Sequence, residues 1–359
     1  MKIAYCPISR NLEAPGDYRR FVGYAKINYL KFDILFPNDL DSIYDGQYDL
    51  VIVTMASDLY FWSNKKFNKT KIIFDCVDSY IFLNSMGFKN SLRAPAKYFS
   101  GQHSGFSFSY LNLIKKIAKK SFSIVCSTIV QKNFFLNYCK DVFISLDYHQ
   151  DYILKKKKEF KLKKKNEINL VWEGLPHNII YSEEANNIIK FINYANKKNF
   201  FNKKVILNVI TDLYYYRYLN KYFLKNTYSQ LLSKTPYINF YEWNKLNFFE
   251  NIIDNDIALI PLSQSNPMEY GKPSNKLFLF YKMNMPVIAS ATPAYKAIEG
   301  ELNHRVTYSN IEGFQEIIDY YVKNNDKRIA YVNDANKLLN NTYPETLISK
   351  SWHQALSHQ

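Results

Sequence analysis

Residues 254–295 read DNDIALIPLSQSNPMEYGKPSNKLFLFYKMNMPVIASATPAY, and this stretch decides the fold class of the chain. Two short apolar runs, Ile257 to Leu262 and Val287 to Ala289, have the length and branching of strands that are buried on both faces. Between them, Ser274 can cap the start of a helix and Asn284 can end it in the left-handed conformation. The stretch therefore predicts a strand–helix–strand unit of a parallel sheet.

Two lysines flank the predicted start of this helix. Lys272 and Lys276 stand where the unpaired N–H groups and the helix dipole already present positive potential. A phosphate at a helix N-terminus, beside the carboxyl end of a parallel strand, would neutralise this charge. By charge alone, side chains that point into solvent explain the two lysines equally well. The pair is therefore a candidate phosphate site with a simpler alternative.

Over the rest of the chain, short apolar runs alternate with helical patterns in two series. The first series comprises Lys2–Cys6, Phe32–Leu35, Leu50–Thr54, Ile72–Asp75, Ile124–Ser127 and Val142–Leu146. The second comprises Ile168–Trp172, Val205–Ile210, Ile238–Tyr241, Ile257–Leu262, Val287–Ser290 and Val306–Tyr308. Strands separated by helices imply parallel sheets with crossover helices, and 359 residues exceed one ordinary core. We therefore expect an α/β protein with two Rossmann-like, doubly wound domains, residues 1–150 and 168–337, that face a cleft.

A lysine-rich segment, residues 151–167, joins the two predicted domains. An exposed charged linker is the simpler interpretation, and a nucleic-acid-binding arm is the alternative. The whole chain has 47 Lys and Arg against 32 Asp and Glu, a net charge of +15. This charge indicates anionic partners, such as nucleotides, anionic lipid headgroups or nucleic acid, without choosing among them.

The run KPSNKLFLFYKMNMPVIAS, residues 272–290, resembles the donor-site segment of GT-B glycosyltransferases. Segments reading VWEG, TD and SATPAY extend the likeness to bacterial polysaccharide-cluster enzymes of the glycosyltransferase family 4-like kind. One position departs from the pattern, because Leu279 stands where many relatives carry a glutamate that contacts the donor sugar or ribose. That contact is then absent or comes from elsewhere, for which Glu269 is a candidate.

The resemblance implies that the second domain holds a nucleotide-sugar donor. Its candidate contacts follow predicted strands or begin the predicted helix: Glu173, Gly174, Thr211, Asp212, Trp243, Ser274 and Asn275. Trp243 could equally be packed core, and Asp212 could cap the next helix. Many relatives carry an Arg and a Lys after the Gly174-like position, where this chain reads LPHNIIYSEE. The diphosphate role is therefore expected to move to Lys272 and Lys276, which we predict to be catalytic.

The first domain should then bind the acceptor. After its first strand, Gly16 permits a tight turn, and Arg19 and Arg20 open the next helix, where they could meet a phosphate of the donor or acceptor. A surface arginine pair is the alternative. Asp78, beyond another buried strand, is the candidate catalytic base or acceptor-hydroxyl contact, whereas Asp75 is as suited to capping a loop.

The composition of the chain leads us to expect a cytoplasmic protein. Its four cysteines lack the paired spacing of a zinc site, and three lie in apolar strand-like runs, as expected for reduced thiols. No signal peptide or membrane-spanning run is visible. The segment SYLNLIKKIAKKSF, residues 109–122, is a basic amphipathic helix that could pack on the sheet or lie on the inner face of the cytoplasmic membrane.

The function that these observations favour is glycosyl transfer from a nucleotide sugar to a hydroxyl of a glycan or lipid-linked glycan in bacterial surface polysaccharide synthesis. The resemblance implies that the anomeric configuration is retained, although the sequence itself does not determine the stereochemistry. No DxD triplet in the cleft-forming loops and no histidine cluster suggests a metal, so we expect metal-independent catalysis with no cofactor beyond the nucleotide-sugar co-substrate. The alternatives are an inactive GT-B-like assembly partner and a basic nucleic-acid-binding protein, although no nucleic-acid-binding signature is visible.

Residues 338–359 form the last predicted element. Leu347, Ile348, Trp352 and Leu356 repeat at helical spacing after a break at Pro344. In GT-B proteins the final helix commonly crosses back to the first domain, and the resemblance implies the same here, with Trp352 buried against residues numbered below 150.

Overall fold

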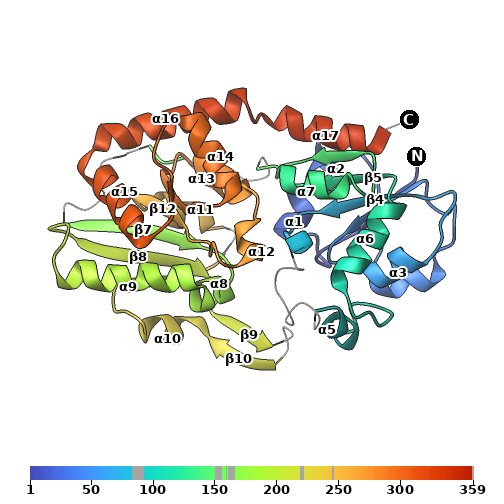
Figure 1. Ribbon diagram of the computed structural model, residues 1–359, viewed down its shortest axis with the longest axis horizontal. Helices are drawn as coiled ribbons and strands as arrows, with labels where there is room; N and C mark the ends of the chain where they lie inside the picture. The colour runs from blue at the N-terminus through green and yellow to red at the C-terminus, as the bar shows by residue number, and fades with distance from the viewer. Residues whose placement is uncertain are drawn as a thin grey trace. The chain divides into compact units, whose positions relative to one another are not determined.

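A computed structural model describes residues 1–82, 93–149, 156–158, 160, 166–218, 222–244 and 246–357 (Figure 1). These residues form two compact units. Unit 1 comprises Met1–Asp151 and Pro344–Gln359, and unit 2 comprises Tyr152–Tyr343. Each is built on a six-stranded sheet in which all pairings are parallel. The predicted α/β class and the two doubly wound sheets are therefore confirmed.

The sheet of unit 1 has the strand order β2-β1-β3-β4-β5-β6. Its strands are β1 (Ile3–Cys6), β2 (Asp33–Ile34), β3 (Leu50–Thr54), β4 (Lys71–Cys76), β5 (Ser123–Cys126) and β6 (Val142–Ile144). Its helices are α1 (Pro15–Tyr18), α2 (Phe21–Ile27), the 3-10 helix η1 (Pro37–Ser42), α3 (Leu59–Asn64), α5 (Arg93–Phe99), α6 (Tyr110–Lys120), α7 (Ile129–Phe135) and α17 (Glu345–Ser357). Every residue of β1, β3 and β5 is buried, which explains their continuous apolar sequences.

Helix α6 is the basic amphipathic segment. Ser109 caps its start by accepting a hydrogen bond from the N–H of Asn112 at 3.2 Å. Its apolar face is buried, including Leu111, Ile114 and Ile117, and the helix packs against α3 and β4. The apolar stripe is thus part of the core of unit 1, and only the lysine face is left for other contacts.

Helix α17 completes the core of unit 1. Trp352 is fully buried, with its ring 5.6 Å from that of Phe21 and 6.3 Å from that of Tyr24. Ser123 Oγ donates to the carbonyl of Ala355 at 2.8 Å. The expected contact between Trp352 and the first unit is present, but the crossing element begins at Glu345, because residues 338–341 still belong to the preceding helix of unit 2.

The sheet of unit 2 has the order β11-β8-β7-β12-β13-β14. Its strands are β7 (Glu167–Glu173), β8 (Lys204–Thr211), β11 (Ile238–Glu242), β12 (Ile257–Ile260), β13 (Val287–Ser290) and β14 (Thr307–Tyr308), and a separate hairpin pairs β9 (Tyr214–Tyr218) with β10 (Tyr222–Asn226). Its helices are α8 (Pro176–Tyr181), α9 (Glu183–Lys197), α10 (Thr227–Leu232), α11 (Phe248–Ile253), α12 (Pro267–Tyr270), α13 (Asn275–Lys282), α14 (Pro293–Leu302), α15 (Ile311–Lys323) and α16 (Asn325–Asn341). Figure 1 shows α9 on one face of this sheet and α13 and α14 on the other.

The predicted linker is only partly described, since residues 151–155, 159 and 161–165 lie outside the described residues. Lys156 and Lys158 are exposed, as expected of a charged linker. Lys157 departs from this expectation, because it is buried and its ammonium donates to the carbonyls of Ile253 and Asn255. The N–H of Lys157 also donates to the carbonyl of Met283 at 2.9 Å. The carbonyls at the end of α11 accept the hydrogen bonds of the Lys157 ammonium. Since α11 is part of unit 2, Lys157 belongs to unit 2 as well.

Candidate functional site

The strand order of unit 2 places its candidate site between two central strands. In order along the chain its strands are arranged 3-2-1-4-5-6, so the direction of winding reverses between β7 and β12. Ligands of open α/β sheets bind outside the carboxyl ends of the strands at this switch point. Glu173 ends β7 there, and Ser274 stands at the start of α13, the helix that connects β12 to β13.

Lys276 lies directly over the end of β7. Its Nζ donates to the backbone carbonyl of Glu173 at 2.8 Å and is 2.9 Å from Glu173 Oε1. An ammonium group has three N–H donors, so this glutamate occupies two of them and leaves one for a ligand. The Lys276 side chain is 32% exposed, which gives a ligand access to it. Two residues that the sequence placed in one site, far apart along the chain, are thus in contact.

Gly174 allows this close approach. Its φ of +152° is a conformation that side chains rarely adopt, and an added Cβ would lie 2.9 Å from Trp172 Cζ2 and 3.4 Å from Lys276 Nζ. Thr211, at the end of β8, is buried and donates its hydroxyl to the carbonyl of Gly174 at 2.6 Å. The Thr211 hydroxyl therefore stabilises the turn after β7. Its effect on a bound ligand would be indirect, through the position of that turn.

The segment before α13 is fixed by Glu269. The Glu269 carboxylate accepts hydrogen bonds from the N–H of Ser263 at 2.7 Å and from the side chain of Asn266 at 3.0 Å. The backbone N–H of Lys272 donates to the carbonyl of Glu269 at 3.2 Å. Leu279, in contrast, is buried in the core. Glu269 thus supports the loop that carries Lys272, and Leu279 does not face a ligand.

Ser274 and Asn275 begin α13 and are both nearly buried. The side chain of Ser274 makes no capping hydrogen bond to the helix that it precedes. Hydroxyls at helix starts usually accept such a bond from the backbone. The first N–H groups of α13 are therefore not capped by Ser274.

Trp243 and Asp212 lie at the ends of two neighbouring strands. The N–H of Trp243 donates to the carbonyl of Thr211 at 2.9 Å, and its indole is 42% exposed, so it is not a core residue. Asp212 is exposed, and the hydroxyl of Thr227 at the start of α10 donates to its backbone carbonyl at 2.8 Å. Desolvation raises the pKa of the Asp212 carboxyl, and the charge of Glu242 adds to the rise. Both side chains remain available at this edge of the sheet.

Two residues at the end of β13 were not singled out from the sequence. Thr292 is fully buried, and its hydroxyl has no hydrogen-bond partner among the described residues. Tyr295, one turn further along α14, is buried, and both burial and the charge of Glu173 raise the pKa of its phenol. A buried hydroxyl is normally satisfied, so Thr292 marks a position that a ligand or water could complete. The resemblance covered SATPAY, but nothing in the sequence distinguished these two side chains.

Unit 1 has its own switch point, between β1 and β3, and a cavity lies there. The cavity has a volume of about 350 Å³ and is lined by Cys6–Arg10 after β1, Ala56–Asp58 after β3, and side chains that include Trp62 and Gln102. Asp17 holds one wall, because its carboxylate accepts hydrogen bonds from the N–H groups of Ile8 and Ser9 at 2.7 and 2.9 Å. The sequence prediction missed both Asp17 and this cavity.

Gly16 has a different role from the predicted turn. It lies within α1 without a positive φ, and an added Cβ would be 2.3 Å from the side chain of Ile8. A larger residue at this position would therefore require the Ile8 side chain to move. Arg19 ends α1, and its guanidinium lies 5.3 Å from the ring centroid of Tyr18.

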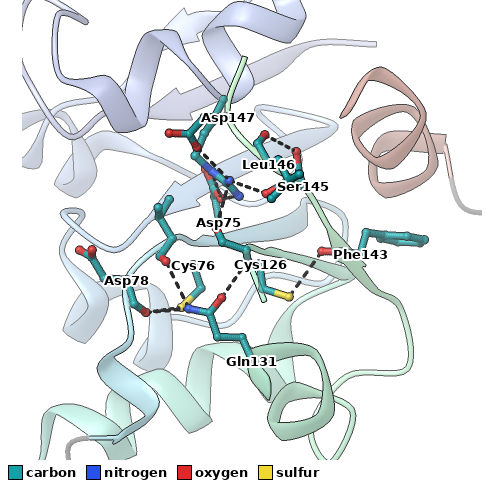
Figure 2. Close-up of polar contacts among 12 residues, drawn as sticks. Asp75, Cys76, Asp78, Cys126, Gln131, Phe143, Ser145, Leu146 and Asp147 are labelled. Atoms are coloured by element: carbon teal, nitrogen blue, oxygen red, sulfur yellow. Dashed lines mark hydrogen bonds and ion pairs between the residues drawn. The ribbon is translucent and has the colours of Figure 1, made fainter. Parts of the chain in front are cut away.

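Arg20 contradicts the prediction of a phosphate contact. Its guanidinium is fully buried, pairs with Asp75 at 2.6 Å and donates to the carbonyl of Ser145 at 2.8 Å. Asp147 Oδ1 lies 3.7 Å from the same guanidinium, and Figure 2 shows the Asp75 and Asp147 side chains within this buried network. Arg20 is therefore a structural ion-pair residue, because its donors face inward and are used by the protein. Asp75 correspondingly does not cap a loop.

Asp78 lies just beyond β4, where its side chain is exposed. The amide of Gln131 donates to the backbone carbonyls of Val77 and Asp78 at 3.2 and 2.9 Å, which fixes this turn (Figure 2). The Asp78 carboxylate also contributes to raising the pKa of Tyr80 to about 12, after the larger effect of burial. The position is compatible with a carboxylate that contacts an acceptor.

No protein-family model and no curated protein matches the chain in sequence. Solved structures do match it in fold. HepE from Anabaena, in complex with UDP-glucose, has a TM-score of 0.63 at 11% identity, with 100% of each chain covered. WaaG, a glycosyltransferase involved in lipopolysaccharide biosynthesis, has a TM-score of 0.62 at 10% identity, with 99% of this chain and 100% of that chain covered.

The chain has the GT-B fold. A third structure, TarM, has a TM-score of 0.59 at 10% identity and is matched over 86% of this chain. The chain spans only 54% of the length of TarM. In this GT-B chain, the part that the structure describes contains no group of three or more His, Cys, Asp or Glu side chains that could hold a metal ion. No helix within the described ranges has the length and hydrophobicity that crossing a membrane requires.

Proposed function

We propose that the protein is a glycosyltransferase that moves a sugar from a nucleotide-activated donor, bound at the switch point of unit 2, to a hydroxyl of an acceptor bound by unit 1. The observation that carries the proposal is Lys276. Its ammonium stands at the end of β7, beside the start of α13, and keeps one N–H donor for a ligand. The fold agrees, and HepE of the same fold was solved with UDP-glucose.

Lys276 and the start of α13 would act on the leaving group. Departure of a nucleoside diphosphate leaves negative charge on its phosphate, and donors already in place stabilise that charge without a metal. Lys272 adds positive charge next to the same helix start. Thr211 and Gly174 would shape the turn against which the nucleotide rests, and Trp243 and Asp212 would border it. Catalysis in this scheme is metal-independent, retains the anomeric configuration and requires no cofactor.

Asp78 would orient or deprotonate the acceptor hydroxyl, and the cavity of unit 1 would hold part of the acceptor. We propose a glycan or a lipid-linked glycan of bacterial surface polysaccharide synthesis. Structures of the same fold provide support, because a TarM variant from S. aureus was solved with fondaparinux, alpha-GlcNAc-glycerol and UDP, and WaaG is involved in lipopolysaccharide biosynthesis.

The proposed location is the cytoplasm, at the inner face of the cytoplasmic membrane. All four cysteines are free and buried, which suits a reducing compartment. The exposed lysines of α6, including Lys116, Lys119 and Lys120, could contact anionic headgroups, since the apolar face of this helix is already packed.

One alternative is supported by specific observations. Leu279 is buried where relatives are expected to present a glutamate, and Glu173 already neutralises Lys276. A GT-B protein that has lost activity and serves as an assembly partner would show both features. The two functions are separated by a thermal-shift screen against nucleotides and nucleotide sugars, followed by an assay of donor hydrolysis. Donor binding with slow hydrolysis supports the glycosyltransferase. A melting temperature that no nucleotide changes supports the inactive assembly partner.

A further inference from the structure

A second group of basic side chains lies in unit 1, around the buried ring of Tyr110. Lys97 Nζ is 5.1 Å and Arg93 Cζ 5.7 Å from the centroid of this ring, and the imidazole of His103 stacks on it at 5.9 Å. The hydroxyl of Tyr110 donates to the carbonyl of Met55 at 3.0 Å, just beyond β3. The group, which we call the Tyr110 basic cluster (Arg93, Lys97 and His103), is thus fixed at the carboxyl edge of the sheet.

The cluster has no carboxylate partner of its own. Among the described residues, no Asp or Glu oxygen lies within 4.0 Å of the charged nitrogens of Arg93 or Lys97. Arg93 Nη2 instead donates to the phenol of Tyr80 at 2.6 Å, and Lys97 Nζ donates to Gln102 Oε1 at 2.9 Å. Burial and the repulsion by Arg93 lower the pKa of Lys97 to about 8, although Asp78 opposes the shift. The protein therefore holds two like charges near each other with no ion pair of their own among the described residues.

His103 adds an unsatisfied polar group to the same place. The side chain is 3% exposed, and neither ring nitrogen has a hydrogen-bond partner among the described residues. The nearest carboxylate in its electrostatic surroundings, Asp58, is engaged by the N–H groups of Phe61 and Ser104 at 3.0 and 2.7 Å. Buried imidazole nitrogens normally have partners, so His103 marks a position that a ligand or a water could complete.

The sequence around the cluster is uniformly basic. No Asp or Glu occurs between Asp78 and Asp141, a span that contains nine Lys and Arg. A segment that has basic but no acidic side chains carries a net positive charge, so it attracts anions. Gln102 also lines the cavity at the switch point of unit 1, donates to the carbonyl of Ala56 at 2.6 Å and accepts from Lys97. The cluster is therefore continuous with that cavity.

We propose that Arg93 and Lys97 bind a phosphate group carried by the acceptor, with His103 as an additional hydrogen-bond donor. Guanidinium and ammonium groups form charge-assisted hydrogen bonds with phosphate oxygens, and the planar guanidinium can do so with two N–H groups at once. Asp78, the proposed contact of the acceptor hydroxyl, lies in the same electrostatic environment. The inference rests on the proposed function, because it assigns the phosphate to the acceptor of the transfer.

The phosphate could belong to a soluble phosphorylated glycan or to a lipid phosphate, and the test has an arm for each. Isothermal titration calorimetry of the full chain with glycerol 3-phosphate measures the soluble chemistry. Co-sedimentation with phosphatidylcholine vesicles that contain a polyprenyl phosphate measures the lipid chemistry. We expect at least one arm to show binding, and Lys97→Met to weaken it about tenfold or more, as expected for the loss of a hydrogen bond to a charged group. Methionine keeps the apolar stem of the lysine against Tyr110.

Lys140→Met is the matched control, since Lys140 lies in unit 1, is exposed and belongs neither to the Tyr110 basic cluster nor to the lysine face of α6. It should bind like wild type. Arg93→Gln provides a second variant if Lys97→Met fails to fold, and it should show the same loss. Equal binding by wild type and both cluster variants, or no binding in either arm, overturns the proposal.

UDP titrations separate this inference from the function on which it rests. Lys97→Met should leave UDP binding unchanged, and Lys276→Met should weaken UDP binding while leaving glycerol 3-phosphate or vesicle binding intact. If Lys97→Met weakens UDP binding instead, the cluster belongs to the donor and the acceptor assignment is wrong. If the wild-type protein binds neither UDP nor any other nucleotide or nucleotide sugar of the thermal-shift screen, the proposed function fails, whatever the phosphate arms show.

Discussion

Arg20 and Asp75 form an ion pair in the interior of unit 1, with neither side chain exposed and two of the guanidinium nitrogens directed at one carboxylate. Their sequence positions differ by 55, so they meet only after β4 has joined the sheet beside β3.

Removing Arg20 should therefore destabilise unit 1. Arg20→Met leaves Asp75 and Asp147 buried without their cation, and breaking a buried pair in this way typically costs about 3–5 kcal/mol. Urea unfolding followed by circular dichroism measures the loss. A phosphate-binding role would instead predict normal stability with weakened ligand binding, and that result would contradict the structural assignment.

Asp147 should make stability depend on pH. Burial raises its pKa to about 6, although Arg20 and Arg19 oppose the rise. In the unfolded chain the pKa is about 3.9, so between these values the folded state binds more protons, and stability falls as pH rises through the window. The loss is on the order of 3 kcal/mol.

Asp147→Asn tests this prediction. The variant should show a flatter stability profile between about pH 4 and pH 6 and a higher free energy of unfolding than wild type at pH 7. Chemical unfolding at a series of pH values gives both quantities. A profile that keeps the wild-type slope would show that another group titrates in this window.

Lys276→Ala should weaken nucleoside-diphosphate binding about tenfold or more and abolish most turnover, while the fold remains intact. Lys272→Ala should have the same effect to a smaller degree. Titration calorimetry with UDP and an assay of donor hydrolysis measure the two effects. Lys296→Ala, an exposed lysine of α14, is the control. Unchanged diphosphate binding in the Lys276 variant would show that the donor site lies elsewhere.

Activity should survive an excess of chelator. The proposed chemistry neutralises the departing diphosphate with Lys276, Lys272 and the start of α13, so no divalent ion takes part. Product formation is measured before and after treatment with EDTA. Loss of activity that magnesium or manganese restores would contradict the mechanism.

Trp352→Ala should lower the free energy of unfolding by about 3–5 kcal/mol, as is usual when a large core side chain is removed. The indole packs against Phe21 and Tyr24 within unit 1. Truncation before Leu347 should have at least this effect. Leu347→Ala is a suitable control, because its side chain is 46% exposed. Equal melting temperatures for wild type and Trp352→Ala would contradict this role.

The strands could be predicted from the sequence because burial on both faces of a parallel sheet demands continuous apolar runs, as in Leu50–Thr54 and Val287–Ser290. The hairpin of β9 and β10 could not. In its tyrosine-rich sequence, apolar and polar residues do not alternate as they do in a typical strand. The hairpin is instead stabilised by cross-strand pairs such as Tyr216 with Leu224.

The candidate site was predictable only where local sequence determines it. Asn284 adopts a φ of +57° after α13, as the predicted helix end requires. The burial of Arg20 was not predictable, because it depends on carboxylates from β4 and from the segment after β6. The Tyr110 basic cluster was not predictable either, because it depends on contacts between Arg93 and Lys97 and the ring of a residue on another helix.

The origin of Trp352 constrains how the protein folds during synthesis. Unit 1 draws its core from the first residues to be translated and from α17, which follows the whole of unit 2 along the chain. Unit 2 is a single uninterrupted segment of the chain, so its core residues are all synthesised while unit 1 still lacks Trp352, Ile348 and Ala355. We therefore expect a nascent unit 1 to expose the apolar surfaces of Phe21 and Tyr24 until α17 has been synthesised, and to be open to aggregation or chaperone binding during that period.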